Sequence, residues 1–154
     1  MIKSPVGIIS YRRLFFLNMK YKLITDGAFS SSRNQGGLGL VFLAEDKLIL
    51  EYSKMYPNVT NNQMELGAII LGLKFIKKPI DSLEIISDSM YCIGCASKGW
   101  KRKKNINMWK EFDSQMQRVE KLCPNIIFTH VKGHAGDKWN EYVDKLAVKA
   151  SQKI

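Results

Sequence analysis

The chain has 154 residues, of which 45% are hydrophobic, so it can bury the core of one folded domain and is not a disordered segment. Lysine and arginine number 24 against 14 aspartates and glutamates, and the formal net charge of +10 favours a polyanionic partner, nucleic acid ahead of membrane. Three cysteines do not make a disulfide framework, and no apolar run approaches the roughly 18 residues of a membrane span, so we expect a cytoplasmic, monomeric protein that does not bind membranes.

Residues 1–18 differ in composition from the rest of the chain. With the four residues that follow, they contain no acid and five basic side chains, Lys3, Arg12, Arg13, Lys20 and Lys22. An amphipathic targeting peptide has this composition, and so does an arm that precedes a true start at Met19. We expect the second: residues 1–18 form a poorly ordered N-terminal extension, and residues 19–152 form the folded domain.

In chain order, the hydrophobic pattern first predicts three strands and a helix. The strands cover residues 20–26, 37–44 and 47–55, with the polar turn FSSSRNQGG after the first and a hairpin at Glu45-Asp46 between the last two. The helix runs from about residue 62 to residue 78, where Pro79 stops it.

The second half of the chain alternates strands and helices. SLEIIS (82–87) predicts a buried strand, residues 90–97 a short helix, and the three-and-four spacing from Trp109 to Cys123 an amphipathic helix. NIIFTHV (125–131) predicts the last strand, and the loop KGHAGD leads into a final helix. This order predicts an α/β fold with a mixed five-stranded sheet, an antiparallel meander plus parallel strands, flanked by helices.

Four carboxylates occupy positions where this pattern predicts burial. Glu65 lies on the inward face of its helix, with no lysine or arginine between it and Leu73. Asp26 ends the strand KLITD, Asp88 follows a buried strand, and Asp144 flanks the apolar stripe of the final helix. One such acid is usually a cap or half of an ion pair, and Asp88 could simply cap the next helix. Four that lean inward from separate elements would repel each other and raise each other's pKa values.

Divalent cations relieve such repulsion. Mg²⁺ takes hard oxygen ligands from few carboxylates and completes its shell with water and substrate phosphate. Two such ions about 3.5–4 Å apart can activate a water and stabilise the leaving oxygen in a phosphodiester displacement. A basic protein with an acidic pocket fits this chemistry, so we expect two Mg²⁺ ions, with Mn²⁺ as a substitute.

At these positions the sequence resembles type 1 ribonuclease H. The motifs are ITDGA around Asp26, TNNQMEL around Glu65, SDSMY around Asp88, and VKGHAGDKWNEYVDKLA, which spans His134 and Asp144. They occur in the family's order over residues 20–150, in matching strand and helix contexts.

The resemblance implies roles for five residues and a reaction. Asp26, Glu65, Asp88 and Asp144 fall on the family's four metal-binding carboxylates, and His134 falls on its histidine, thought to assist proton transfer or product departure. The family cleaves the RNA strand of RNA–DNA hybrids and leaves 5′-phosphate and 3′-hydroxyl ends. The resemblance therefore implies an RNase H-like fold and a metal-dependent endoribonuclease, a phosphodiester hydrolase.

The resemblance also implies contacts with the hybrid. Asn61 and Asn62 match the family's minor-groove contacts, where the 2′-hydroxyl distinguishes RNA from DNA. Thr60 and Asn105 match part of a pocket that holds a phosphate of the DNA strand. Helix capping is the alternative role for Thr60, Asn61 and Asn62.

Residues 98–104, KGWKRKK, form a short basic segment where some members of the family carry a long basic protrusion. Its basic side chains could bind backbone phosphates, and the indole of Trp100 could stack on bases or pack on the protein. A solvated turn is the alternative. The substrate-binding candidates in this segment are Lys101, Arg102 and Lys103.

Three rival interpretations stay open at this point. The first is a hybrid-binding module without catalysis, which the presence of all four acids disfavours. The second is a related nuclease of the resolvase or integrase type, which TNNQMEL and KGHAG disfavour. The third is a zinc site, whose ligands would be Cys92, Cys95, His130 and His134. Its spacing is too long for a small finger, and cysteines three apart on a helix more often pack as apolar residues.

Overall fold

One five-stranded sheet organises the computed structural model, which describes residues 19–133 and 136–154. The predicted extension, 1–18, and His134 lie outside the described residues. The strands are β1 (Lys20–Ser30), β2 (Gln35–Ala44), β3 (Lys47–Pro57), β4 (Ser82–Ser87) and β5 (Asn125–His130), in the order β3-β2-β1-β4-β5. β2 pairs antiparallel with β1 and β3, while β4 pairs parallel with β1 and β5. The predicted mixed sheet is confirmed.

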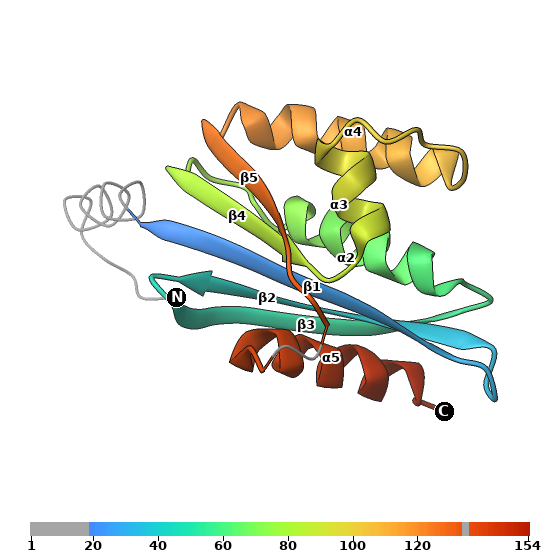
Figure 1. Ribbon diagram of the computed structural model, residues 1–154. Coiled ribbons are helices and arrows are strands. Elements are labelled where there is room, and N and C mark those ends of the chain that lie inside the picture. Colours follow the sequence, from blue (N-terminus) through green and yellow to red (C-terminus); the bar gives the residue numbers. More distant parts are fainter. Residues whose placement is uncertain (1–18, 134–135) are drawn as a thin grey trace.

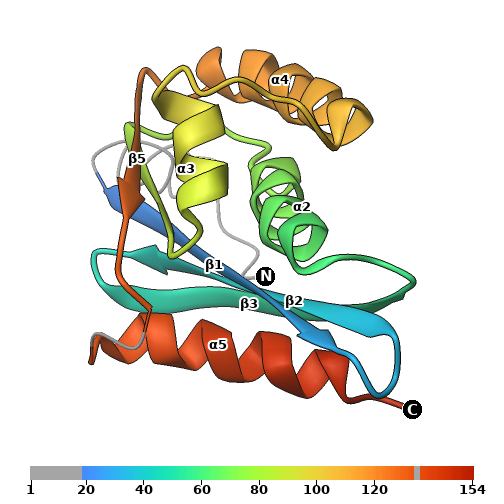
Figure 2. The same ribbon diagram turned by 45° about the vertical axis from the view of Figure 1, so that its right-hand side comes forward.

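Helices cover both faces of this sheet. α5 (Lys138–Ser151) lies along one face, beneath β1, β2 and β3, whereas α2 (Asn61–Lys74), α3 (Met90–Ser97) and α4 (Ile106–Glu120) lie on the other (Figures 1 and 2). No helix in the described part of the chain is both long enough and apolar enough to cross a membrane.

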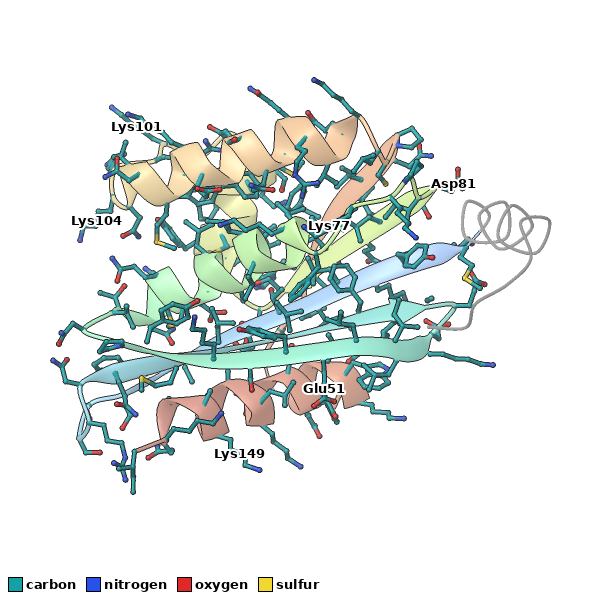
Figure 3. The ribbon with its side chains drawn as sticks, turned by 180° about the vertical axis from the view of Figure 1, so that it is seen from behind. Glu51, Lys77, Asp81, Lys101, Lys104 and Lys149 are labelled. Atoms are coloured by element: carbon teal, nitrogen blue, oxygen red, sulfur yellow. The ribbon has the colours of Figure 1, made fainter. Side chains whose placement is uncertain are left out.

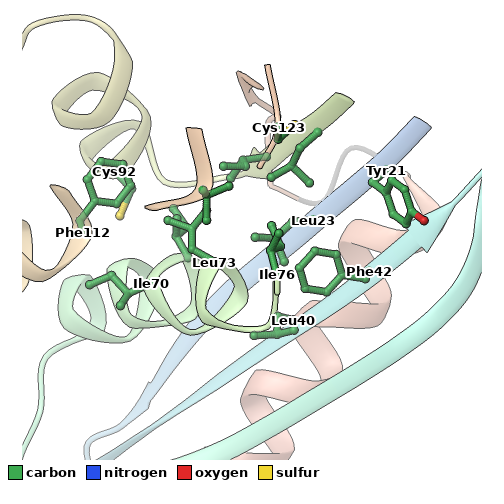
Figure 4. Packing of buried hydrophobic residues seen from close by; sticks show 14 of the residues in the cluster. Tyr21, Leu23, Leu40, Phe42, Ile70, Leu73, Ile76, Cys92, Phe112 and Cys123 are labelled. Atoms are coloured by element: carbon green, nitrogen blue, oxygen red, sulfur yellow. The ribbon is translucent and has the colours of Figure 1, made fainter. Parts of the chain in front are cut away.

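The larger part of the hydrophobic core lies between the sheet and the α2–α4 side (Figure 4). Leu23 of β1 packs there with Leu73 of α2 and Phe112 of α4. The next residue along β1, Ile24, belongs to a second cluster with Val143 of α5. β1 is therefore buried on both faces at this point, which explains why two apolar residues, Leu23 and Ile24, follow one another in its sequence.

The hairpin between β2 and β3 forms where the sequence predicts it. Glu45 and Asp46 have φ angles of 49° and 65°, as the two central residues of a type I′ turn require. This turn has the twist of the strands it joins, so β2 and β3 pair along almost their whole length.

Helix α2 ends at Lys74, four residues earlier than predicted. Arg118 of α4 donates hydrogen bonds from its guanidinium to the main-chain oxygens of Leu73 and Ile76, at 2.7 and 2.6 Å. These bonds satisfy carbonyl groups that the next helical turn would otherwise engage. The segment before Pro79 is also biased away from helix by the proline ring. The prediction of a helix to residue 78 was wrong because its terminus depends on a side chain more than 40 residues away.

Candidate active site

Three of the predicted carboxylates converge at one edge of the sheet. Asp26 lies on β1, Asp88 directly follows β4, and Glu65 lies in the second turn of α2. β1 and β4 are parallel neighbours with Thr25 opposite Ser87, so the next residue of each strand reaches the same edge. One carboxylate oxygen from each of the three acids lies within 4.8 Å of the others.

Gly27 allows Glu65 to come this close to β1. A Cβ atom at position 27 would lie 2.5 Å from the main-chain nitrogen of Glu65 and 2.7 Å from the carbonyl carbon of Met64. Both are backbone atoms that cannot move aside without displacing α2. The absence of a side chain at Gly27 therefore sets how closely α2 approaches β1, and with it the distance from Glu65 to Asp26.

Two of the three carboxylates are buried and Asp88 is half-buried, and no cationic side chain within the described residues is paired with them. Asp26 is 3% exposed and Glu65 is 6% exposed. The described ion pairs join other residues, and neither Glu65 Oε1 nor Asp88 Oδ1 has a hydrogen-bond partner in the described structure. Asp26 Oδ1 accepts a hydrogen bond of 2.8 Å from the main-chain N–H of Gly27.

Burial and mutual repulsion raise the pKa values of two of these acids. Desolvation is the main cause for Glu65, and the neighbouring Asp26 and Asp88 add to it, so the pKa of Glu65 lies far above its ordinary value. Desolvation also raises the pKa of Asp26, with a further contribution from Asp88. Without a cation, the raised pKa favours the protonated form of Glu65 at neutral pH.

Asp144 approaches from the other side of the sheet. It lies on α5, half-buried, and is not a member of the three-carboxylate group. Its charge nevertheless contributes to the raised pKa of Asp26. His134 lies outside the described residues, between the described ends of the loop that joins β5 to α5.

The turn that carries Asp88 shows that this aspartate does not cap α3. Ser89 is the N-cap, and its Oγ accepts a hydrogen bond of 3.1 Å from the main-chain N–H of Cys92. Ser87 Oγ in turn accepts from the N–H of Ser89 at 3.0 Å. The two serines satisfy the start of the helix, which leaves the Asp88 carboxylate for the cluster.

The predicted contacts with substrate gather where α2 and α4 begin. Thr60 is the N-cap of α2 and forms a capping box with Gln63, so its helix-capping role is realised. Gln63 donates from its amide to Asn105 Oδ1 at 3.3 Å, and Asn105 donates to the hydroxyl of Tyr91 at 3.0 Å. Thr60 and Asn105 are thus joined through one hydrogen-bonded network. Asn61 and Asn62 are exposed in the first turn of α2.

The basic segment, residues 98–104, is fastened to α4 by one of its own charges. Arg102 makes two hydrogen bonds to the carboxylate of Asp113, at 2.9 and 2.7 Å. Its guanidinium also lies over the ring of Trp109, 4.4 Å from the centroid. Lys101 and Lys103 remain exposed on either side of it. Figure 3 shows Lys101 and Lys104 projecting from this end of the molecule.

Cys92 and Cys95 are buried in α3, as their helical spacing predicts. Burial raises the pKa of the Cys92 thiol to about 12, so it stays protonated and packs as a small apolar side chain.

Three residues that shape the site were not predicted from the sequence. Gln63 and Tyr91 connect the two helix starts, and Gly27 permits the close approach of α2. The TDG triplet shows that a glycine follows Asp26, but the α2 residues that Gly27 contacts are distant from it in the sequence. Only the packing of α2 on β1 reveals its role.

The donor set fits divalent metal ions. Three carboxylates offer hard oxygen ligands at one point, and two of their buried oxygens lack a partner in the described structure. A dication there would supply the missing positive charge and favour the ionised carboxylates. The cluster is therefore a candidate metal centre.

Comparison with known proteins gives the fold and site a family. The sequence matches the RNase H family over residues 18–152. A curated protein named Ribonuclease H from Rhodopirellula baltica is 40% identical, in an alignment that covers 86% of this chain and 90% of the relative. The chain belongs to the ribonuclease H family. Ribonuclease HI from Synechocystis is 37% identical, over 84% of this chain and 86% of the relative. Members of this family are endonucleases of the hydrolase class, and the predicted enzyme class is confirmed.

Solved structures agree on the fold. The amino-terminal RNase H domain of a Mycobacterium tuberculosis protein superposes with a TM-score of 0.71 at 24% identity, covering 87% of this chain and 94% of that chain. LC11-RNase H1, solved in complex with an RNA/DNA hybrid, superposes with a TM-score of 0.70 at 24% identity, covering 84% and 95%. At this identity the likeness shows the fold: the RNase H-like α/β architecture is confirmed.

Proposed function

We propose that this ribonuclease H cleaves the RNA strand of RNA–DNA hybrids by metal-dependent hydrolysis and leaves 5′-phosphate and 3′-hydroxyl ends. The observation that carries the proposal is the meeting of Asp26, Glu65 and Asp88 within 4.8 Å, with no cationic side chain paired to them in the described structure. The ribonuclease H solved with a bound RNA/DNA hybrid supports the choice of substrate.

The carboxylates would hold two Mg²⁺ ions, for which Mn²⁺ can substitute. Asp26, Glu65 and Asp88 would form the centre of the metal site, and Asp144, whose charge contributes to the raised pKa of Asp26, would complete it from α5. When bound, the ions would supply an activated water molecule and positive charge for the leaving oxygen of the phosphodiester. His134 follows β5 in the loop that leads to α5, and its proposed task is to move a proton or to help the product leave.

Residues at the helix starts would hold the hybrid in register with the metal centre. Asn61 and Asn62 lie three to four residues before Glu65, which is about 4.5–6 Å along a helix axis. Their exposed amides can donate to and accept from a ribose 2′-hydroxyl. Thr60 and Asn105, joined through Gln63, lie beside two helix N-termini, where a phosphate of the DNA strand would be favoured.

The basic segment would add contacts with the phosphate backbone. Lys101 and Lys103 are exposed and provide mobile point charges for this purpose. Arg102 is held by Asp113 and Trp109, so it fixes the course of the segment. The part of its guanidinium that these residues leave uncovered would face the phosphates.

Incubating the protein and Mg²⁺ with an end-labelled hybrid, beside matched double-stranded RNA and DNA, tests the proposal. We expect cuts in the RNA strand of the hybrid alone, none in the presence of EDTA, and products whose 3′ ends a polymerase can extend. Cleavage of either matched duplex at a comparable rate, or undiminished cleavage in EDTA, would contradict the proposal.

A pair of substitutions locates the metal centre. Asp88→Asn should retain hybrid binding and lose about two orders of magnitude or more in rate, the size of effect typical when an electrostatic group is removed from an active site. Asp81→Asn makes the same chemical change at an exposed position before the other end of β4, and should leave the rate unaltered. Equal rates for the two variants would show that Asp88 is not part of the metal site.

A further inference from the structure

We propose that His130 is a positioning residue for Asp88: it ties the peptide that carries this carboxylate to the end of β5 and so sets the affinity of the site for metal. The inference rests on the proposed function, because it concerns the metal centre. His130 otherwise entered only the disfavoured zinc interpretation.

The contact joins two neighbouring strands at their carboxyl ends. In the parallel pairing of β4 and β5, His130 lies opposite Ser87, the residue before Asp88. His130 Nε2 lies 3.2 Å from the main-chain oxygen of Asp88. With its proton on Nε2, the imidazole donates a hydrogen bond to this carbonyl.

A second hydrogen bond from the same segment makes the attachment rigid. The main-chain N–H of Val131 donates to the main-chain oxygen of Ser87 at 3.0 Å. β5 and its exit thus engage two successive carbonyl groups, those of Ser87 and Asp88. The two carbonyl groups belong to the peptide units on either side of the Asp88 Cα atom, so the two bonds together restrain the backbone dihedral angles of Asp88 more than either bond alone would.

Asp88 needs this restraint because it lies beyond its strand. β4 ends at Ser87 and α3 begins at Met90, so neither a sheet ladder nor a helical turn fixes the Asp88 carbonyl. Ser87 Oγ accepts from the N–H of Ser89 and so holds the turn on its α3 side. In the described structure, His130 is the side chain that holds the Asp88 carbonyl itself.

The loop after β5 also leaves room for the Asp88 carboxylate. A Cβ atom at Gly133 would lie 3.3 Å from Asp88 Oδ2, closer than carbon and oxygen normally approach. The segment from His130 to Gly133 therefore binds the carbonyl group of Asp88 and passes close to its carboxylate. Moving this segment would move the ligand.

Residues that orient a metal ligand from outside the coordination shell typically change metal affinity by about 10–100-fold when removed. His130 acts on the backbone of the ligand, so we expect the lower end of this range. His130→Phe keeps a planar ring and removes the hydrogen bond, whereas His130→Gln places an amide N–H close to the position of Nε2. Ile127→Thr is the control: Ile127 is 59% exposed on the same strand, away from the site.

The test is titration calorimetry of the full-length chain with MgCl₂ in the absence of nucleic acid, with thermal unfolding and cleavage rates measured in parallel. We expect His130→Phe to weaken Mg²⁺ binding about tenfold and His130→Gln to retain most of the affinity. We also expect excess Mg²⁺ to restore cleavage by His130→Phe, and Ile127→Thr to behave as the unaltered protein.

The outcomes separate this inference from the function on which it rests. If the unaltered protein binds no Mg²⁺, the proposed metal centre fails and this inference fails with it. If the unaltered protein binds Mg²⁺ and His130→Phe binds it equally well, only the role of His130 is overturned. Equal losses of Mg²⁺ affinity in His130→Phe and His130→Gln, matched by equal losses of thermal stability, would show a packing role and also overturn it.

Discussion

Glu65 is the residue at which stability and function conflict most directly. It occupies a position on α2 that an apolar side chain could fill, it is 6% exposed, and one of its oxygens has no hydrogen-bond partner in the described structure. Burying an acid in this way is unfavourable unless it becomes neutral or gains a cation. Because Asp26 and Asp88 add repulsion, the metal-free protein carries an electrostatic penalty at this point. Metal binding would relieve it.

The raised pKa values of Glu65 and Asp26 determine how stability depends on pH. Their ordinary values are 4.5 and 3.8, and both are higher in the folded protein. Below about pH 3 both groups are largely protonated in the folded and the unfolded chain. As the pH rises further, the unfolded chain releases these protons first, so the free energy of unfolding decreases. We expect thermal unfolding in EDTA to occur at lower temperature at about pH 8 than at about pH 5, and Mg²⁺ to reduce the difference.

Glu65→Gln removes the ionisable group that has the larger penalty. In EDTA near pH 8, we expect this variant to exceed the unaltered protein in free energy of unfolding by about 1–2 kcal/mol, with its cleavage activity lost. Denaturant unfolding gives the first quantity. Glu141→Gln, an exposed change on α5, should alter stability by less than about 0.5 kcal/mol. A less stable Glu65→Gln variant would mean that the carboxylate is stabilised by something other than a metal.

Among the structural elements, the contact between α2 and β1 determines the geometry of the site. β1 supplies Asp26, α2 supplies Glu65, and Gly27 lets the two backbones approach. A small displacement of α2 changes the distance between the two carboxylates directly, because close-packed interiors transmit strain.

Two glycine substitutions, one on each of these elements, test this contact. Gly27→Ala would place a methyl group 2.5 Å from the backbone of α2, so we expect a loss of about 1–3 kcal/mol or more in stability and a large loss of activity. Gly67→Ala lies in α2 itself, and its methyl group would meet Leu38 and Met108 at ordinary distances of 3.5 and 3.8 Å. Because alanine favours helix, this variant should be stabilised by about 0.5–1 kcal/mol and remain active. Chemical denaturation and hybrid cleavage measure both; equal tolerance of the two changes would contradict the role of Gly27.

The elements were largely predictable from the sequence because each has a strong local pattern. Alternation and apolar runs gave the strands, and the hairpin at Glu45-Asp46 followed from turn chemistry. The buried acids followed from their positions in these patterns. Contacts between distant segments could not be found in this way. Arg118 ends α2 from α4, and His130 reaches Asp88 from β5, across 42 residues in each case.

At the scale of the whole molecule, the surface is basic whereas the candidate metal site is acidic. The net charge is +10, yet Asp26, Glu65 and Asp88 share one buried site. Lysines lie on both faces: Lys101 and Lys104 project beside α4, whereas Lys149 projects from α5 on the opposite side of the sheet (Figure 3). Long-range attraction depends on all of these charges, but a bound hybrid can contact only those that face the site.

The salt dependence of hybrid binding distinguishes contact from general attraction. Each phosphate contact releases counterions and contributes about 0.7–0.9 to the slope of log affinity against log salt concentration. If Lys101 and Lys103 contact phosphates, replacing both with alanine should lower the magnitude of this slope by about 1.5. Replacing Lys145 and Lys149 of α5 removes the same charge from the opposite face and should leave the slope nearly unchanged. Fluorescence anisotropy in EDTA, where cleavage is blocked, measures both. Phosphate contact depends on where a lysine lies, whereas general attraction depends only on the net charge. Equal changes of slope in the two double variants would therefore show that the basic segment contributes only to net charge.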